Sequence, residues 1–209
     1  MTIESEKIGI INYGLGNIRS LKNCIESLNF KVQIINNPSN LEKYDKIILP
    51  GVGSFKKAMS LINSLGWSDK ILENVKVKKK KILGICLGMQ ILLSKGYEFG
   101  ETKGLNLISG EVVSLKSEGC NELLPHIGWN EVEIKKNNTL FDNIPNNSSF
   151  YFINSYVCKL TDTTKESGST NYGLNFTSAL NFQNIYGTQF HPEKSSKIGR
   201  QLLNNFLNA

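Results

Sequence analysis

Short apolar runs alternate with amphipathic stretches through the first half of the chain. Runs of aliphatic residues predict buried strands at 7–12, 31–35, 45–50 and 81–85. Between and after them, apolar residues recur every three or four positions, which predicts helices at 18–28, 55–65, 69–77 and 87–94. This alternation is typical of an α/β fold, in which an open, mostly parallel central sheet is flanked by helices.

The pattern changes after Gly110. Apolar and polar residues now alternate in short segments separated by Asn, Gly and Ser, which predicts antiparallel strands at 111–115, 130–134, 150–154 and 178–182. A final strand at 185–190 and a helix at 198–207 follow. We find no internal repeat and no long linker, so we expect residues 1–209 to form a single domain whose sheet carries an antiparallel extension. We expect the polar segment 135–149 to be a mobile loop.

The composition is that of an ordinary globular protein. Of the 209 residues, 40% are hydrophobic and 20% are charged, which excludes disordered and fibrous chains. No apolar stretch reaches the roughly 18 residues that cross a bilayer, and the first residues lack the pattern of a secretion signal. We therefore expect a cytoplasmic protein that has no membrane partner.

The net charge of +6 comes almost entirely from lysine, since Arg19 and Arg200 are the only arginines. Proteins that read bases and phosphates rely on the arginine fork, so we predict no nucleic-acid partner. The densest basic run, at 76–81, falls where a helix should end, and lysines there would complement the helix dipole. An anion-attracting patch is the alternative.

The sequence indicates neither a metal site nor a nucleotide site. The four cysteines lie more than thirty residues apart and form no CxxC pair, so we expect neither zinc nor a disulfide framework. Two glycine loops, NYGLGN at 12–17 and PGVGSF at 50–55, lack both the Walker spacing and the full GxGxxG. We predict no cofactor. In an open α/β sheet, such loops surround a crevice at the carboxyl ends of the strands.

The sharpest local feature is LGICLGMQ, in which Gly84 and Gly88 flank Cys86 between a predicted strand and a predicted helix. The arrangement is that of a nucleophile elbow with cysteine as the nucleophile. At a helix N-terminus the partial positive charge favours thiolate, and the Leu87 amide would face an oxyanion formed on an attacked carbonyl. The PGVG loop could provide a second oxyanion donor. A cysteine that only packs in the core is the alternative.

A cysteine nucleophile needs a base, and the chain contains only two histidines. His191 follows the last predicted strand in QFHPEKS, where Pro192 favours extended backbone at the histidine. Glu193 lies two residues on, so an extended chain would place its carboxylate on the same side as the imidazole and orient the ring. His126, in LPHIGWN, has no acid beside it in the sequence, and we expect a structural or interface residue there.

These motifs together resemble a known family. LGICLGMQ followed by QFHPEKS resembles the class I, triad-type glutamine amidotransferases, whose Cys, His and Glu release ammonia from glutamine. NYGLGNIRS, LPGVGSF, PHIGWN and FYFINSY narrow the resemblance to the glutaminase subunits of imidazole glycerol phosphate synthase, over nearly the whole chain. Two segments depart from the family pattern: Asn154 stands where histidine is usual, and KGYEFGE replaces the more usual Ser-Glu-Glu.

The resemblance implies a role for each matching residue. Cys86 would be the nucleophile, His191 the base and acid, and Glu193 the carboxylate that orients the imidazole. The oxyanion would be bound by backbone at Gly51, Val52 and Leu87. Contacts to the glutamine substrate would come from Gln90, Glu98, Ser155 and Tyr156, and contacts to a partner from Asn17, Trp129, Asn130, Tyr151 and Lys194.

The resemblance also implies a partner, because in this family the ammonia passes to a separate cyclase/synthase subunit, a barrel enzyme. A heterodimer, an ammonia channel and partner-dependent hydrolysis would follow. The acceptor in histidine biosynthesis is a phosphorylated aminoimidazole-carboxamide ribonucleotide. Paralogous subunits that supply ammonia to a nucleotide-sugar acid in surface-polysaccharide synthesis share these motifs and are an alternative. A silent scaffold subunit and a free-standing cysteine hydrolase are two further alternatives.

Overall fold

The computed structural model describes residues 6–135 and 139–209. Its strands join in one hydrogen-bonded sheet with the order β2-β1-β3-β4-β13-β12-β10-β7-β5-β6, and β11, β8 and β9 continue sideways from β12. The strands are β1 (Ile8–Ile11), β2 (Val32–Ile35), β3 (Lys46–Gly51), β4 (Lys81–Cys86), β5 (Leu93–Gly96), β6 (Thr102–Lys103), β7 (Ile108–Ser114), β8 (His126–Ile134), β9 (Ser148–Asn154), β10 (Tyr156–Leu160), β11 (Glu166–Asn171), β12 (Asn175–Phe182) and β13 (Ile185–Thr188). The α-helices are α1 (Ile18–Glu26), α2 (Phe55–Ser64), α3 (Trp67–Leu72), α4 (Leu87–Ile91) and α5 (Ser196–Asn208).

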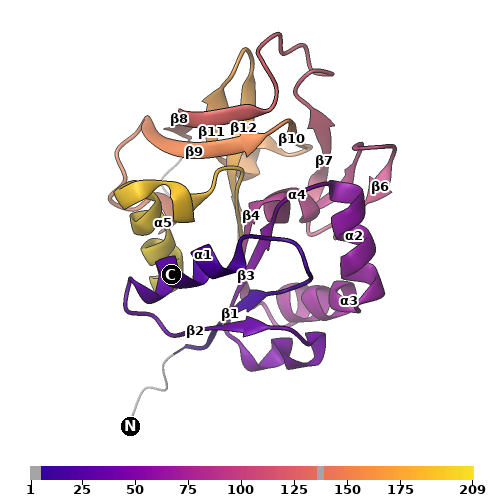
Figure 1. Cartoon of the computed structure of the whole chain (residues 1–209), viewed down its shortest axis with the longest axis vertical. Helices are drawn as coiled ribbons and strands as arrows, with labels where there is room; N and C mark the ends of the chain where they lie inside the picture. The colour runs from indigo at the N-terminus through magenta and orange to yellow at the C-terminus, as the bar shows by residue number, and fades with distance from the viewer. Residues whose placement is uncertain (1–5, 136–138) are drawn as a thin grey trace.

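The parallel half of the sheet has helices on both faces. Strands β2, β1, β3, β4 and β13 pair in parallel, and every residue of β1 and β3 is buried. Figure 1 shows α1 and α5 on one side of these strands and α2 and α3 on the other. Each helical layer has its own core, centred on Leu21, Ile25 and Phe206 on one face and on Phe55 and Trp67 on the other. Burial on both faces explains the continuous apolar runs in the sequence.

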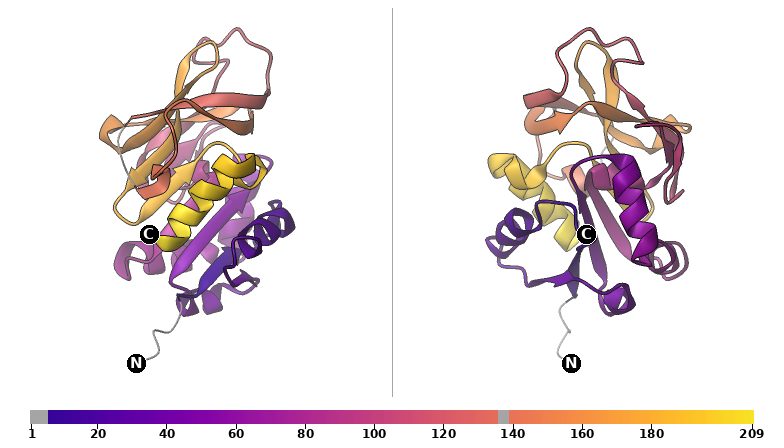
Figure 2. Two further views of the ribbon diagram at one scale, coloured as in Figure 1. Left: turned by 90° about the vertical axis from the view of Figure 1, so that its left-hand side faces the viewer. Right: turned by 45° about the vertical axis from the view of Figure 1, so that its right-hand side comes forward.

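The remaining strands form the predicted antiparallel extension. β12 pairs antiparallel with β13, β10 and β11, and β8 joins β11 to β9. Figures 1 and 2 show this extension on one side of the helical layers, beyond the carboxyl ends of β3 and β4. The prediction of an α/β fold with a largely parallel sheet and an antiparallel extension is confirmed.

Two predicted helices were wrong in their extent. The helix predicted at 87–94 ends at Ile91, because backbone amides of the loop before β7 bind the carbonyls that would continue it. Leu105 N donates to Ile91 O at 2.9 Å and Gly104 N donates to Ser94 O at 2.8 Å, so residues 93–96 form strand β5 instead. The helix predicted at 69–77 begins earlier, at Trp67, and finishes as a π-helical turn, Glu73–Val77.

The segment predicted as a mobile loop, 135–149, is partly packed. Its residues 136–138 lie outside the described residues. The part that follows contains a 3₁₀ turn, Thr139–Phe141, and buries Leu140, Phe141 and Ile144 in the core beside α5. Apolar residues inside a polar segment therefore anchor most of this connection.

The lysine-rich run at 76–81 lies where the helical segment ends and β4 begins, as predicted. Lys78 pairs with Glu73 at 2.8 Å, Lys80 donates to Tyr44 O at 2.6 Å, and Lys81 donates to Ala209 O at 2.6 Å. These contacts engage three of the lysines with oxygen atoms of neighbouring elements.

Candidate active site

Cys86 occupies a sharp turn between β4 and α4. Its backbone has φ 55° and ψ −113°, a conformation that non-glycine residues rarely adopt and that is typically kept at functional sites. The flanking glycines let α4 pack directly against the strands, since a Cβ at Gly88 would lie 1.8 Å from Leu49 O and one at Gly84 would lie 2.7 Å from Gly88 O. The tight turn predicted around Cys86 is therefore present.

The Cys86 thiol lies near one polar group from β9 and one from the residue that follows β13. Its Sγ lies 3.9 Å from the carbonyl oxygen of Ile153 on β9 and receives a contact of 3.6 Å from Nε2 of Gln189. The side-chain amide of Gln189 therefore lies directly beside the sulfur. Gln189 could not be identified from the sequence, because its contacts with Cys86 and Gln90 join residues about a hundred positions apart.

His191 is held rigidly beside the thiol. Its backbone amide donates to Tyr151 O at 2.9 Å, and Ser195 Oγ donates to its carbonyl at 2.6 Å. Nδ1 lies 2.9 Å from Glu193 Oε1, the contact predicted from the sequence. The prediction assumed extended backbone from His191 to Glu193. His191 itself is extended, but Pro192–Lys194 form a 3₁₀ turn, and this turn brings the carboxylate back to the ring.

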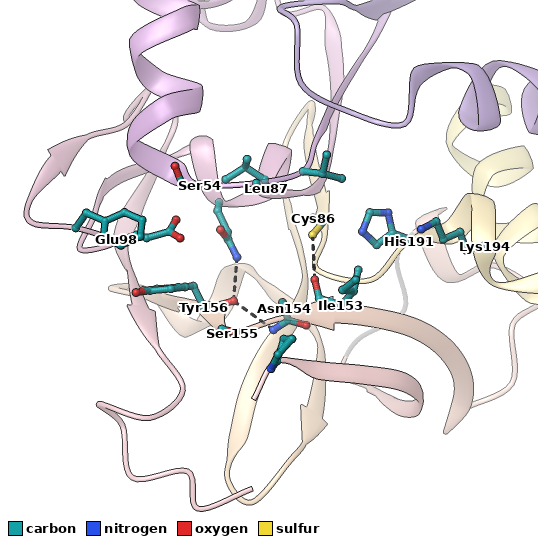
Figure 3. A pocket seen from close by; sticks show the side chains of 15 residues that line it. Ser54, Cys86, Leu87, Glu98, Ile153, Asn154, Ser155, Tyr156, His191 and Lys194 are labelled. Carbon is teal, nitrogen blue, oxygen red and sulfur yellow. Dashed lines mark hydrogen bonds between the residues drawn. The ribbon is translucent and has the colours of Figure 1, made fainter. Parts of the chain in front are cut away.

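The electrostatics of His191 favour a charged ring. Nε2 is buried and has no hydrogen-bond partner among the described residues, and Figure 3 shows the ring beside the Cys86 sulfur. Burial lowers the pKa of His191, but its interactions with the thiol of Cys86 and the carboxylate of Glu193 outweigh this effect and raise the pKa to about 10. The raised pKa keeps the His191 ring protonated at neutral pH, beside the sulfur of Cys86.

A cavity of about 520 Å³ opens in front of Cys86 and His191. Figure 3 shows side chains from several separate elements converging on it. Six of the other residues predicted to bind the oxyanion or the substrate line it, namely Val52, Leu87, Gln90, Glu98, Ser155 and Tyr156. Gly51 does not line the cavity; it lies at the end of β3, opposite Cys86 in the ladder between β3 and β4.

Two of these lining residues are fixed by internal hydrogen bonds. Gln90 Nε2 donates to Tyr156 O at 2.9 Å and to Gln189 Oε1 at 3.0 Å, so the side chain crosses from α4 to β10. Glu98 Oε2 accepts from the Phe55 amide at 2.7 Å, at the N-terminus of α2. Neither orientation was apparent from the sequence.

Asn154, the departure from the family pattern, also lines the cavity. Its Nδ2 donates to Tyr156 O at 3.2 Å, the same carbonyl that accepts from Gln90. Its Oδ1 is buried and has no hydrogen-bond partner among the described residues. Asn154 therefore belongs to the polar wall that faces Cys86.

Of the predicted partner contacts, Lys194 lines this cavity, and the other four lie outside its lining and differ in exposure. Trp129 is 54% exposed, its ring packs edge-on against Tyr151 at 6.1 Å, and the Lys194 ammonium lies 5.6 Å from the centre of the Tyr151 ring. Asn17 is exposed at the N-terminus of α1, which packs against the turn that contains Lys194. Asn130 differs, because its amide is engaged internally and donates to Asn171 O at 2.9 Å.

The second histidine is built into the extension. His126 is 3% exposed and stacks between Tyr172 and Phe152, with ring centroids 4.0 and 4.9 Å away. Its Nε2 lies 3.3 Å from Nδ2 of Asn130, and burial lowers the pKa of the ring to about 4. A neutral, stacked imidazole fits the structural position expected for it.

Within 6–135 and 139–209, His, Cys, Asp and Glu side chains form no group of three placed to hold a metal ion. Over the same ranges, every helix is too short or too polar to cross a membrane.

Comparison with known proteins bears on the whole chain. The family described as glutamine amidotransferase class-I matches residues 9–209. Imidazole glycerol phosphate synthase subunit HisH 1 of Campylobacter jejuni is 46% identical over 199 residues, covering 95% of this chain and 98% of that protein. The subunit HisH of Leptospira interrogans is 43% identical and covers 95% of this chain and 98% of its own.

Solved structures of other proteins share the fold of this chain. A chain of PurLQS from Thermotoga maritima has a TM-score of 0.77 at 18% identity, covering 98% of this chain and 99% of that chain. At this low identity the likeness concerns the fold alone. The family match and the two relatives, in contrast, extend over almost all of the sequence. The chain therefore belongs to the class-I glutamine amidotransferases, within the family of the HisH subunit of imidazole glycerol phosphate synthase.

Proposed function

We propose that this protein is the glutaminase subunit of an imidazole glycerol phosphate synthase, which hydrolyses glutamine to glutamate and passes the ammonia to a synthase subunit in histidine biosynthesis. The observation that carries the proposal is the position of His191 beside the Cys86 thiol, with Glu193 2.9 Å behind the ring. Family membership supports the same activity.

The proposed reaction begins with attack of the Cys86 thiolate on the carboxamide carbon of glutamine. The tetrahedral oxyanion collapses, the C–N bond breaks, and the imidazolium of His191 protonates the departing ammonia. A γ-glutamyl thioester remains on the sulfur. The now neutral imidazole takes a proton from water, which attacks the thioester and releases glutamate and the free thiolate. Glu193 keeps the ring in one orientation through both steps.

The oxyanion would be stabilised by backbone amides, with Leu87 at the N-terminus of α4 and Val52 after β3 as the donors. Both residues line the cavity together with the sulfur. Gln90, Glu98, Ser155 and Tyr156 would hold the rest of the glutamine molecule. The cavity, at about 520 Å³, has room for a free amino acid.

A partner is part of this proposal, because free ammonia is protonated in neutral water and loses its nucleophilicity. The relatives carry the name of a synthase subunit, which fits a heterodimer with a barrel-type cyclase/synthase subunit. Exposed apolar side chains beside the cavity provide a surface for it, namely Ile127, Trp129 and Ile153. All four cysteines are free, which fits a reducing cytoplasm.

Of the two acceptors considered from the sequence, the histidine-pathway ribonucleotide is the better supported, since both relatives described above are imidazole glycerol phosphate synthase subunits. A purified complex would decide between them. We expect ammonia transfer to the aminoimidazole-carboxamide ribonucleotide with the cyclase subunit. Transfer only to a nucleotide-sugar acid would contradict the histidine-pathway assignment.

The chemistry itself is tested by Cys86→Ala. Without the thiolate no thioester can form, so glutamate release by the complex should fall by at least about 10⁴-fold. An electrophilic glutamine analogue should label the wild-type sulfur and leave the variant unlabelled. Cys120→Ser is the matched control, because Cys120 lies in the extension, where its thiol donates to Tyr172 O. Normal turnover by Cys86→Ala would remove Cys86 from the mechanism.

A further inference from the structure

Tyr13 carries a buried hydroxyl that neither the fold nor the mechanism has used so far. The residue is 1% exposed, and its OH has no hydrogen-bond partner among the described residues. Unsatisfied buried hydroxyls are rare, because they forgo hydrogen bonds to water without recovering one in the protein. The loop around Tyr13 is nevertheless well fixed. Asn12 N donates to Ile35 O at 3.0 Å, and Gly14 N donates to Asn12 Oδ1 at 3.1 Å.

The hydroxyl lies against the backbone that leads into the oxyanion region. A Cβ added to Gly51 would lie 2.6 Å from Tyr13 OH and 2.9 Å from Leu87 Cβ. Gly51 is thus packed between the hydroxyl and the beginning of α4. Tyr13 and Gly51 do not line the cavity, whereas Val52 does, so the Gly51–Val52 peptide joins a residue that touches the hydroxyl to a residue that faces the cavity.

The geometry of a trans peptide links these two sides. The only cis peptide bond in the described residues precedes Pro125, so the Gly51–Val52 bond is trans and its C=O and N–H point in opposite directions. If the Gly51 carbonyl points back toward Tyr13, the Val52 amide points forward into the cavity that holds Cys86. One hydrogen bond behind the peptide would therefore fix a donor in front of it.

We propose that the Tyr13 hydroxyl is a positioning group that donates to the Gly51 carbonyl and thereby directs the Val52 amide toward the oxyanion. This inference rests on the proposed function. The hydroxyl gains its missing acceptor when the Gly51 carbonyl points toward Tyr13, and in that orientation the Val52 amide points toward Cys86. Turning this peptide satisfies the hydroxyl, so the orientation competent for catalysis is favoured by a hydrogen bond that the present conformation lacks.

The test is Tyr13→Phe, which keeps the ring and removes only the oxygen. In the complex with the cyclase subunit and the acceptor nucleotide, we expect kcat for glutamine hydrolysis to fall about tenfold, with KM for glutamine unchanged. The midpoint of thermal unfolding should stay the same or rise, because the variant loses an unsatisfied polar atom. The pH profile of Cys86 alkylation by iodoacetamide should not move, since the hydroxyl acts on the peptide and not on the thiol.

Tyr44→Phe is the matched control. Tyr44 OH donates to Gln33 Oε1 at 2.8 Å, far from the cavity, so this variant should lose some stability and keep kcat. An undiminished kcat in Tyr13→Phe, with an active wild type, would overturn the positioning role alone. A fall in kcat together with a shifted alkylation profile would also overturn it, because the hydroxyl would then act on the sulfur. A wild-type complex without glutamine turnover would refute the proposed function itself.

Discussion

The two histidines show how differently one side chain responds to its surroundings. His191 meets a thiol and a carboxylate, which raise its pKa to about 10 against the effect of burial. His126 meets aromatic rings and an amide, and burial alone lowers its pKa to about 4. The first environment supports proton transfer, and the second keeps the ring neutral at physiological pH.

The lowered pKa of His126 predicts a loss of stability in mild acid. An unfolded chain protonates this histidine near pH 6.5, while the folded protein resists protonation until about pH 4. Between these values the unfolded state binds the additional proton, so the free energy of unfolding should fall as the pH drops through this window. Urea titrations from pH 7 to pH 4 measure the effect, and His126→Phe should reduce the slope.

His191→Asn is the control for this measurement. Because the folded pKa of His191 is raised, its contribution to stability is complete below pH 6.5 and is lost as the pH rises through about 10. Its removal should alter the pH dependence above 6.5 and leave the acid window as in the wild type. Equal slopes for the wild type and His126→Phe between pH 6.5 and pH 4 would contradict the prediction.

Individual residues differed in how far the sequence could identify them. Cys86 stood out because its glycine neighbours are local, and His191 because the chain offers only one other histidine. Gln189 and Tyr13 could not be recognised, because their relevance depends on contacts with residues more than thirty positions away. A polar atom becomes conspicuous only when the tertiary structure buries it.

Among the elements, the junction of β4 and α4 depends most strictly on side-chain size. Gly88 leaves room for the Leu49 carbonyl, since a methyl group there would lie 1.8 Å from the oxygen. Leu49 is fixed in the ladder between β3 and β4, and α4 follows β4 without a connecting residue, so neither backbone can shift freely. This junction therefore sets the position of the thiol.

Gly88→Ala should consequently destabilise the protein by about 3 kcal/mol or more, as overpacked cores do. Gly66→Ala is the matched control: no atom lies within 4 Å of the added carbon, so only the left-handed backbone, at φ 77°, opposes it, at about 1 kcal/mol. Chemical denaturation of both variants measures the difference. Equal stabilities would show that the junction adapts.

Elements with a clear pattern of apolar residues could be predicted from the sequence, and elements without one could not. The buried parallel strands and the amphipathic helices α1, α2 and α5 follow directly from the spacing of apolar residues. Strand β5 was missed because its first residues continue the apolar run that was predicted as a helix at 87–94, and β6 has only two residues. The end of α4 was missed because it is decided by hydrogen bonds from the loop at 104–108, not by the helix sequence itself.

For the molecule as a whole, the site lies where the two halves of the sheet meet. The parallel half supplies Cys86 and the loop after β3, and the extension supplies Ile153, Asn154 and Tyr156. The exposed apolar side chains of β8 and β9 lie on the same hairpin, with Ile127 paired to Ile153. A partner seated there would contact the strand that carries part of the cavity wall.

Ile127→Asp should therefore uncouple the subunit from its partner. A charge on this face, where Ile127 is 57% exposed, should weaken binding of the cyclase subunit roughly tenfold or more and lower acceptor-dependent hydrolysis in parallel. Val77→Asp, at an exposed position beyond α3, should leave binding unchanged. Titration calorimetry with the cyclase subunit measures the affinities, and wild-type affinity in Ile127→Asp would exclude this face.

The backbone at Cys86 has an evolutionary consequence. Position 86 combines the reactive sulfur with torsion angles that suit glycine far better than any residue with a Cβ. A glycine there would relax the main chain and leave an inert protein that tolerates heat better than its active ancestor. Selection for stability would therefore favour glycine at position 86, whereas selection for ammonia release requires cysteine there.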